Sequence, residues 1–395
     1  MITVTEARDI IVSNARPLAA ERLSIEAARG RTLREQIVAQ RAHPPFAASA
    51  MDGYALRSAD TPGRLRLIGE AGAGHGLSRP LQPGECARIF TGAPVPDGAD
   101  SVLIQEDAER DGDTVIAPRV EHGRHVRAAG VDFERGAILL EPGHTLGAGA
   151  VALAAAAGRA ELSVTRRPRV ALLSGGDEIV PPGVEPAADQ IFDSVSYGIA
   201  AQIESIGGAP VRSGPLRDDP KAIAATVANT LAHADLLVLV GGASVGDHDH
   251  ARPALRALGA ELLFEKIALR PGKPTWFARC DGKLVLGLPG NPASAFVCSR
   301  LFLRPLLDRL LGRDPAASMR TRYAKLRGSL AANGARETYL RARLDADASG
   351  RLWVSSATNQ DSSLISVFAT SNALIRRSPE SPAASEGELV ELLDL

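Results

Sequence analysis

The sequence predicts a multidomain α/β plus β protein, and three observations support this fold class. Strands and helices alternate between residues 169 and 314, as they do in a doubly wound parallel α/β sheet. Residues 44–135 and 315–395 instead contain short apolar runs separated by glycine and proline, which favour a β-barrel-like insert and a C-terminal β domain. A length of 395 residues also suggests about two to four domains.

The N-terminal segment, residues 1–43, is expected to be helical and to pack with residues 136–168 as an elongated linker region of helix and strand. Thr3 and Glu6 form a capping box, and apolar residues then recur on one face of a helical pattern that extends to about residue 40. The β-barrel-like domain, residues 44–135, interrupts this linker in the sequence.

The central domain, residues 169–314, carries clear start signals for its helices and strands. We expect buried strands at residues 170–173, 235–240 and 284–286. We expect helices to begin at Asp193-Ser194, Asp219-Pro220 and Asn291-Pro292, because Asp, Ser and Asn cap helices and proline suits the first turn. Ligands of such sheets bind at the carboxyl ends of the strands, so the site is expected there.

Composition excludes several classes of function. The net charge is −1 and only 4 % of residues are aromatic, which argues against a nucleic-acid or membrane partner. Cys86, Cys280 and Cys298 are widely spaced, so they indicate neither a disulfide framework nor a zinc site. The N-terminus lacks the pattern of a signal peptide, and we therefore expect a cytoplasmic protein.

The most informative stretch is the loop after the 235–240 strand, GGASVGDHDH at residues 241–250. Two glycines let the backbone turn sharply and approach a ligand closely. The amides and the Ser244 hydroxyl suit a phosphate, whereas Asp247 and Asp249 suit the Mg²⁺ that accompanies one. Alone, the pattern is also that of an ordinary tight turn.

Six separated segments strengthen this interpretation. They are PFAASAMDGY at 45–54, RIFTGAPVPDGAD at 88–100, RPRVALLSGGDE at 167–178, GGASVGDHD at 241–249, LRPGKP at 269–274 and GLPGNPAS at 287–294. Their order and spacing over nearly the whole chain resemble one family, the molybdopterin molybdenumtransferases, similar to the E-domain of gephyrin.

The resemblance implies an elongated homodimer whose central domain is molybdopterin-binding and adenylyltransferase-like. Such an enzyme binds adenylyl-molybdopterin, inserts molybdate at the dithiolene and releases AMP with the help of Mg²⁺. Its further partners would be the molybdopterin adenylyltransferase and molybdoenzyme apoproteins. Molybdate and tungstate are almost equal in size and charge, so either oxyanion suits the same donors.

The resemblance also assigns roles to individual positions. Asp52 and Thr91 would face the active site of the other protomer. The residues expected to act in catalysis are Asp52, Thr91, Glu178, Asp218, Asp249, Lys266 and Lys273, with Asp247 and Asp249 as metal ligands. The residues expected to hold the substrates are Gly241, Gly242, Ser244, Gly246, Arg270, Pro289, Gly290, Asn291, Pro292, Arg341 and Ser362. Arginine, lysine and hydroxyl donors are suited to a tetrahedral oxyanion.

Some of these positions also have structural interpretations. Asp52 could simply begin a turn, and Asp218 could cap a helix, although Asp219 is better placed as the cap. Residues 271–274 could be a rigid turn. His248 and His250 near carboxylates suggest metal ligands, but loop histidines of this kind are more often solvated, and the family pattern places no ligand there.

Two other functions remain open. The sibling enzyme, molybdopterin adenylyltransferase, resembles residues 169–312 alone and typically carries a Gly-Gly-Thr-Gly loop. A non-catalytic scaffold of the gephyrin type would be expected to lose the acidic and basic groups, which are present here. The chain departs from the family pattern at Ala47, Ala48, Gly175, Val195, His250 and Arg270, which leaves open a specialised paralogue.

Overall fold

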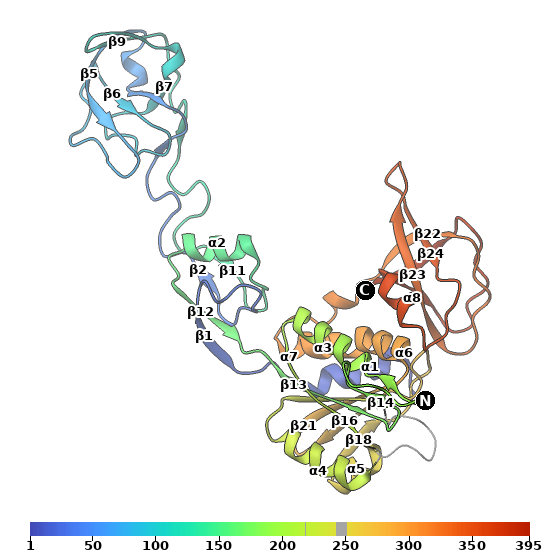
Figure 1. Cartoon of the computed structure of the whole chain (residues 1–395). Helices are drawn as coiled ribbons and strands as arrows, with labels where there is room; N and C mark the ends of the chain where they lie inside the picture. The colour runs from blue at the N-terminus through green and yellow to red at the C-terminus, as the bar shows by residue number, and fades with distance from the viewer. Residues whose placement is uncertain (218, 242–250) are drawn as a thin grey trace.

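The computed structural model describes residues 1–217, 219–241 and 251–395, and its shape is strongly elongated (Figure 1). A small β domain occupies one end, and a narrow linker connects it to the central α/β domain. The C-terminal β domain lies beside the α/β domain at the other end. In the described ranges, no helix is both long and apolar enough to cross a membrane.

The N-terminal helix α1 (Val4–Asn14) has the predicted capping box, with Thr3 and Glu6 bonded reciprocally. The expectation that the helix continues to about residue 40 is wrong. Ala15 is already extended, and proline at position 17 has no amide hydrogen for a helix. Further along, the chain instead forms β1 (Ala20–Ser24), so tertiary pairing replaces the helical pattern.

The linker is held together by strands from both of its chain passages. β1 pairs with β12 (Glu161–Thr165), and β2 (Ile37–Val38) pairs with β11 (Ile138–Leu140), both antiparallel. The alanine-rich helix α2 (Ala148–Ala156) covers a small apolar core on these strands. Helix α1 packs elsewhere, because its buried face joins the core of the α/β domain.

The outer domain is a curled six-stranded sheet with the order β7-β4-β6-β5-β9-β8. Apolar clusters lie on both of its faces, as expected for a β-barrel-like insert. Its strands are β3 (Ala48–Ser49), β4 (Gly53–Leu56), β5 (Gly63–Ala71), β6 (Glu85–Ile89), β7 (Ser101–Ile104), β8 (Glu109–Asp111), β9 (Thr114–Ala117) and β10 (Val126–Arg127), and β3 and β10 form a separate pair. The short 3₁₀ helices η1 (Ser58–Asp60) and η2 (Gln105–Asp107) connect them.

The central sheet confirms the predicted parallel α/β core and adds an antiparallel edge. The order is β16-β13-β17-β21-β20-β18. The first four strands are parallel to one another, β20 is antiparallel to β21, and β18 is antiparallel to β20. These strands are β13 (Arg169–Gly175), β16 (Ala209–Leu216), β17 (Leu236–Val240), β18 (Glu261–Phe264), β20 (Trp276–Cys280) and β21 (Lys283–Leu288). Strand β16 contains two prolines, which an edge strand tolerates. Because prolines interrupt the usual strand pattern, this strand was not predicted from the sequence.

Helices cover both faces of this sheet. On one face lie α3 (Val195–Ile206), α6 (Pro292–Cys298), the π-helical turn η3 (Ser299–Leu303) and α7 (Arg304–Leu310); on the other lie α4 (Pro220–Leu231) and α5 (Ala251–Ala257). Three helix starts agree with the prediction, and Asp219 accepts a hydrogen bond from the amide of Lys221. Gly207 ends α3 in the left-handed conformation.

The C-terminal domain is a β sheet, as predicted, but it also contains two short helical segments that the sequence did not reveal. Its elements are η4 (Ala317–Met319), β22 (Arg322–Arg327), β23 (Glu337–Ala346), β24 (Leu352–Ser356), α8 (Ile365–Thr370), β25 (Ala373–Arg377) and β26 (Leu389–Asp394). Helix α8 packs on α6 of the α/β domain, where the rings of Phe296 and Phe368 stack 4.7 Å apart. Strand β19 (Leu269–Arg270) of the α/β domain pairs with β23.

The packing of the central sheet yields a first prediction. Gly287 of β21 lies opposite Trp276 of β20, and a Cβ at this glycine would overlap the buried indole. Gly287→Ala is therefore expected to destabilise the protein by about 1–3 kcal/mol, the usual cost of overpacking. Gly149→Ala is the control, since this helical glycine faces open space. Thermal unfolding should show a lower midpoint for the first variant only; equal midpoints would contradict the packing argument.

Candidate active site

The carboxyl ends of three neighbouring parallel strands meet at closely packed glycines. Gly241 follows β17 with a φ of +81°, and a Cβ there would lie 2.6 Å from the carbonyl oxygen of Gly175 at the end of β13. Gly290 comes just after β21, and a Cβ there would lie 3.4 Å from the Cα of Gly241. The absence of side chains here leaves backbone exposed to a ligand at the strand ends.

These strand ends border a cavity of about 620 Å³, which we call the strand-end cavity. It brings together several of the sequence-predicted residues, namely Glu178, Gly241, Pro289, Gly290, Asn291 and Pro292. Its side wall is the short parallel pair β14 (Ile179–Val180) and β15 (Ile191–Phe192). Phe192 is about half exposed there, so the cavity offers an aromatic surface beside bare backbone.

A buried acid stabilises the floor of the strand-end cavity. Asp193 is 3 % exposed and accepts hydrogen bonds from the hydroxyl of Ser174 at 2.8 Å and from the hydroxyl and amide of Ser196 at 2.5 and 3.1 Å. Arg212 lies 3.9 Å from the same carboxylate. The sequence identified Asp193 only as a helix cap, whereas it also ties the start of α3 to the end of β13.

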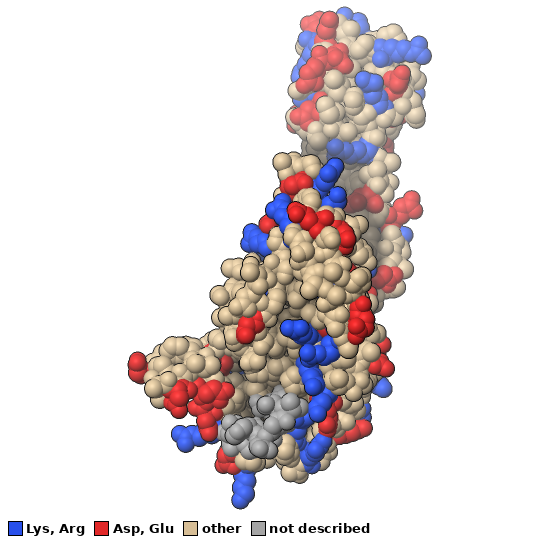
Figure 2. All heavy atoms as spheres, turned by 90° about the vertical axis from the view of Figure 1, so that its right-hand side faces the viewer, with Lys and Arg blue, Asp and Glu red and all other residues tan. Residues whose placement is uncertain are grey.

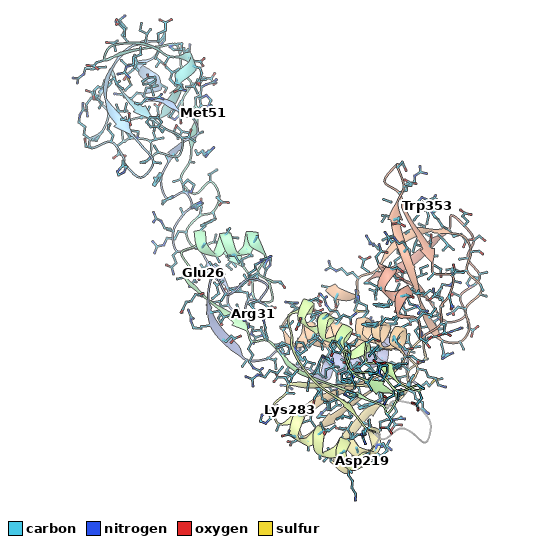
Figure 3. The ribbon with its side chains drawn as sticks, in the orientation of Figure 1. Glu26, Arg31, Met51, Asp219, Lys283 and Trp353 are labelled. Carbon is cyan, nitrogen blue, oxygen red and sulfur yellow. The ribbon has the colours of Figure 1, made fainter. Side chains whose placement is uncertain are left out.

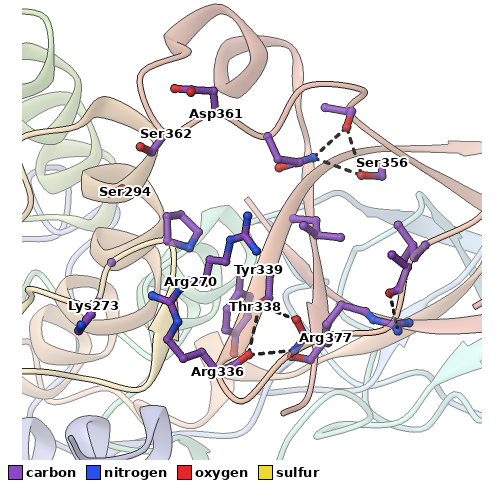
Figure 4. Close-up of a pocket in the computed structure, with 18 of the residues that line it drawn as sticks. Arg270, Lys273, Ser294, Arg336, Thr338, Tyr339, Ser356, Asp361, Ser362 and Arg377 are labelled. Atoms are coloured by element: carbon purple, nitrogen blue, oxygen red, sulfur yellow. Dashed lines mark hydrogen bonds between the residues drawn. The ribbon is translucent and has the colours of Figure 1, made fainter. Parts of the chain in front are cut away.

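A second cavity, of about 820 Å³, lies between the α/β domain and the C-terminal domain (Figure 4). We call it the basic cavity, because Arg270, Lys273, Arg336 and Arg377 line it and Asp361 is its one lining carboxylate among the described residues. Of the predicted residues, Arg270, Lys273 and Ser362 are present. Arg336 and Arg377 could not be identified from the sequence, because they belong to no motif.

The two cavities adjoin. Pro274 lines both, and Ser362 of the basic cavity is followed by Ser363 of the strand-end cavity. The side-chain amide of Asn291 donates a hydrogen bond to the hydroxyl of Ser362 at 3.1 Å, which bridges the domains at this point. Figure 2 shows a run of basic side chains on the face that carries these two domains. A ligand that spans both cavities would meet backbone at one end and cations at the other.

Arg341 was expected to contact the oxyanion, but its side chain is directed elsewhere. It is 1 % exposed and is absent from the lining of the basic cavity. Its guanidinium donates to the side chain of Gln360 at 3.1 Å and to the carbonyl of Asp361 at 2.8 Å. Burial lowers the pKa of Arg341. In this conformation, Arg341 holds the 357–361 segment that forms the cavity wall.

Three other predicted residues lie away from both cavities. Lys266 is exposed and lines neither of them, and its carbonyl accepts a hydrogen bond from the amide of Ile2. Asp52 and Thr91 belong to the outer domain, at the opposite end of the molecule. In Figure 3, Met51, which precedes Asp52 in the outer domain, lies far from Asp219 of the α/β domain.

Asp52 and Thr91 form a pair of their own. One carboxylate oxygen of Asp52 accepts from the amide of Thr91 at 2.7 Å and from its hydroxyl at 2.8 Å. These bonds, with the nearby Arg88 guanidinium, lower the pKa of Asp52. The acids that line the strand-end cavity, Glu178 and Asp193, therefore belong to the α/β domain, whereas Asp52 belongs to the outer domain.

The remaining predicted residues are Asp218, Gly242, Ser244, Gly246, Asp247 and Asp249, and these lie outside the described residues together with His248 and His250. Among the described residues, no three His, Cys, Asp or Glu side chains come together in a way that could hold a metal ion.

The Asp52–Thr91 pair yields a second prediction. Removing the hydroxyl in Thr91→Val deletes one hydrogen bond to the carboxylate, so the pKa of Asp52 should rise toward its ordinary value. Thr91→Ser keeps the hydroxyl and should leave the pKa nearly unchanged. Carboxyl-carbon NMR titration of the two variants checks this, and identical titration curves would show that the hydroxyl does not hold the charge.

Sequence-family models match three consecutive parts of the chain. They are described as MoeA N-terminal region (domain I and II) at residues 2–158, Probable molybdopterin binding domain at 171–309, and MoeA C-terminal region (domain IV) at 323–395. The strand-end cavity lies within the second of these regions, and most of the basic cavity is contributed by the third.

Curated relatives and solved structures agree with these matches. A molybdopterin molybdenumtransferase from Nostoc sp. is 36 % identical and covers 81 % of this chain and 76 % of its own length. One from Haemophilus influenzae is 31 % identical over 99 % of this chain and 98 % of its own. A crystal structure of the molybdopterin biosynthesis moea protein from Pyrococcus horikosii superimposes with a TM-score of 0.86 at 32 % identity, covering 100 % of this chain and 99 % of that one. On this similarity over its whole length, the chain belongs to the MoeA family of molybdopterin molybdenumtransferases.

Proposed function

We propose that this protein inserts molybdate into adenylylated molybdopterin and releases AMP during molybdenum cofactor biosynthesis. The observation that carries the proposal is the pair of adjoining cavities. One has bare backbone at the strand ends, and the other is lined by cations that form no ion pair with any carboxylate of the described residues. A substrate that joins a pterin phosphate to AMP and reacts with a tetrahedral dianion needs both environments side by side.

Each cavity suits a different part of this reaction. In the strand-end cavity, backbone amides near Gly241 and Gly290 can approach phosphate oxygens closely, and the Phe192 ring offers a flat apolar surface. In the basic cavity, Arg270, Lys273 and Ser362 offer charged and hydroxyl donors to molybdate. Fixed donors of this kind also stabilise negative charge that develops during phosphoryl transfer.

Mg²⁺ is part of the proposal. Asp247 and Asp249 would hold it, since they follow Gly241 on the same loop and supply the carboxylate oxygens that Mg²⁺ prefers. Glu178, which lines the strand-end cavity, would assist them. When bound, the cation would neutralise charge on the bridging phosphates. Lys266 and Asp218 remain in the proposal as catalytic residues on the strength of the family resemblance alone.

The separation of Asp52 and Thr91 from both cavities supports a homodimer. Asp52 lies on a projecting domain remote from both cavities of its own chain, and its carboxylate could complete the site of a second copy. We therefore propose composite active sites, each with a strand-end cavity from one protomer and Asp52 and Thr91 from its partner. The enzyme would work in the cytoplasm between the molybdopterin adenylyltransferase and molybdoenzyme apoproteins.

The function is tested by supplying purified protein with adenylyl-molybdopterin, molybdate and Mg²⁺. AMP release is expected from the wild type, whereas Asp249→Asn should bind the substrate but release AMP orders of magnitude more slowly, because the carboxylate charge is lost. Pyrophosphate release from ATP and molybdopterin would favour the adenylyltransferase instead. Binding without any turnover by the wild type would favour a scaffold.

The composite site is tested by mixing two inactive variants. Asp52→Asn and Glu178→Gln each damage every site of their own homodimers. In a heterodimer, one of the two sites contains neither substitution. An equimolar mixture that is allowed to exchange subunits should therefore recover roughly a quarter of the wild-type AMP release. No recovery, with exchange verified by mass spectrometry, would place both residues in one protomer's site.

A further inference from the structure

Asp52 shares one face of the outer-domain sheet with an arginine and two aromatic rings. It lies two residues before Tyr54 of β4, and Arg88 of β6 is directly opposite Tyr54 in the antiparallel register. Side chains two residues apart on a strand, and side chains directly opposite each other, project from the same face of a sheet. Asp52 and Arg88 therefore lie on the same side, and the ring of Phe90 contacts Arg88 there.

The guanidinium of Arg88 is fixed over the start of β4. Its central carbon lies 5.3 Å from the centre of the Tyr54 ring and 4.9 Å from that of Phe90, distances at which an aromatic ring attracts a cation. One of its nitrogens donates to the carbonyl of Gly53 at 3.1 Å, and another donates to the side-chain oxygen of Gln105 at 2.6 Å. The side chain thus reaches from β6 across β4 to the residue that follows β7.

The same contacts fix the backbone next to Asp52. The carbonyl of Asp52 accepts a hydrogen bond from the amide of Gln105 at 3.1 Å, and the next carbonyl, that of Gly53, accepts from Arg88. Gly53 packs so closely on β7 that a Cβ there would lie 1.9 Å from the carbonyl oxygen of Leu103. The two peptide groups that follow the Asp52 side chain are therefore held by the neighbouring strands.

The carboxylate of Asp52 nevertheless keeps one oxygen available. Both hydrogen bonds from Thr91 go to Oδ1, and within the described ranges Oδ2 accepts no hydrogen bond and the carboxylate forms no ion pair. Because its other contacts hold Arg88, its charge acts on the carboxylate from a distance and leaves Oδ2 unoccupied. The hydrogen bonds from Thr91 are the larger cause of the lowered pKa of Asp52, and the charge of Arg88 adds to them.

The other charged groups near Asp52 do not replace Arg88. The elements next to β4 are β6, β7 and η2. Glu85, the other charged residue of β6, is bound by two arginines of its own, and β7 has no charged residue. Glu106 and Asp107 of η2 are exposed acids, and a neighbouring acid raises the pKa of a carboxyl. On these elements, Arg88 is therefore the cation that stabilises ionised Asp52.

We propose that Arg88 is a positioning residue for Asp52, which fixes the adjacent backbone and presents the carboxylate with Oδ2 open to a ligand. That this ligand lies in the active site of the partner protomer rests on the proposed function. The effect of Arg88 on Asp52, in contrast, is confined to one chain.

Carboxyl-carbon NMR titration of the full chain tests the link between the two residues without substrate. Arg88→Gln keeps an N–H donor but removes the charge, so the pKa of Asp52 should rise toward its ordinary value, whereas Arg88→Lys should keep it low. Arg64→Met is the matched control, because this exposed arginine lies on β5, which β6 separates from β4. It should leave the pKa unchanged. An unchanged pKa in Arg88→Gln, with the wild-type unfolding midpoint, would overturn the proposal.

AMP release tests the consequence for the reaction. Arg88→Gln should lower kcat and kcat/KM together by roughly ten- to a hundredfold, because a misplaced carboxylate affects the transition state more than substrate binding. If Arg88→Gln unfolds the outer domain, Gln105→Leu is used instead. It removes the acceptor of the guanidinium but keeps the charge, so kcat should fall while the pKa of Asp52 stays low.

Wild-type kcat in a folded Arg88→Gln or Gln105→Leu variant would show that Arg88 does not position Asp52 for the reaction. A wild type that binds adenylyl-molybdopterin but releases no AMP would instead count against the proposed function. In that case the NMR titration still decides whether Arg88 controls Asp52.

Discussion

A parallel strand pair, only two residues long on each strand, joins the two domains that form the candidate site. Leu269 and Arg270 of β19 leave the α/β domain and pair with Glu337 and Thr338 at the start of β23 in the C-terminal domain. The backbone amide of Glu337 also donates to the carbonyl of Ala268 at 3.0 Å. Because backbone hydrogen bonds fix position more tightly than side-chain contacts do, the loop that carries Lys273 is held against the other domain and the basic cavity keeps its shape.

Each domain contributes what its architecture provides most easily. The α/β domain supplies strand ends where glycines bring backbone close to a ligand. The C-terminal sheet supplies charged side chains from strands and loops, and the buried Arg341 and the half-buried Asn333 hold those loops in place. The outer domain carries Asp52, whose pKa is lowered by two hydrogen bonds from Thr91, and in the proposed homodimer this carboxylate would complete the partner's site. Such preorganised charge costs no rearrangement during a reaction.

The thin linker places the outer domain far from both cavities of its own chain. Its two chain passages are joined by the β1–β12 and β2–β11 pairs, which produce a narrow connection with a small apolar core. This connection keeps the outer domain, where Met51 precedes Asp52, at the far end of the molecule from the α/β domain. In the proposed homodimer, one rotation would complete two sites at once.

The sequence by itself determined the features that depend on neighbouring residues. The capping box of α1, the starts of three central helices, the parallel strands and the glycines at their ends all follow from local patterns, and the structure has them. Only the tertiary structure decided the rest. After Asn14, strand pairing with a segment more than a hundred residues away replaces the helical pattern. Arg341 is buried behind the wall of the basic cavity, and Lys266 lies outside that cavity. Arg336 and Arg270 line it together. Contacts between distant segments carry no local signal, because their free energy arises only when the folded domains bring those segments together.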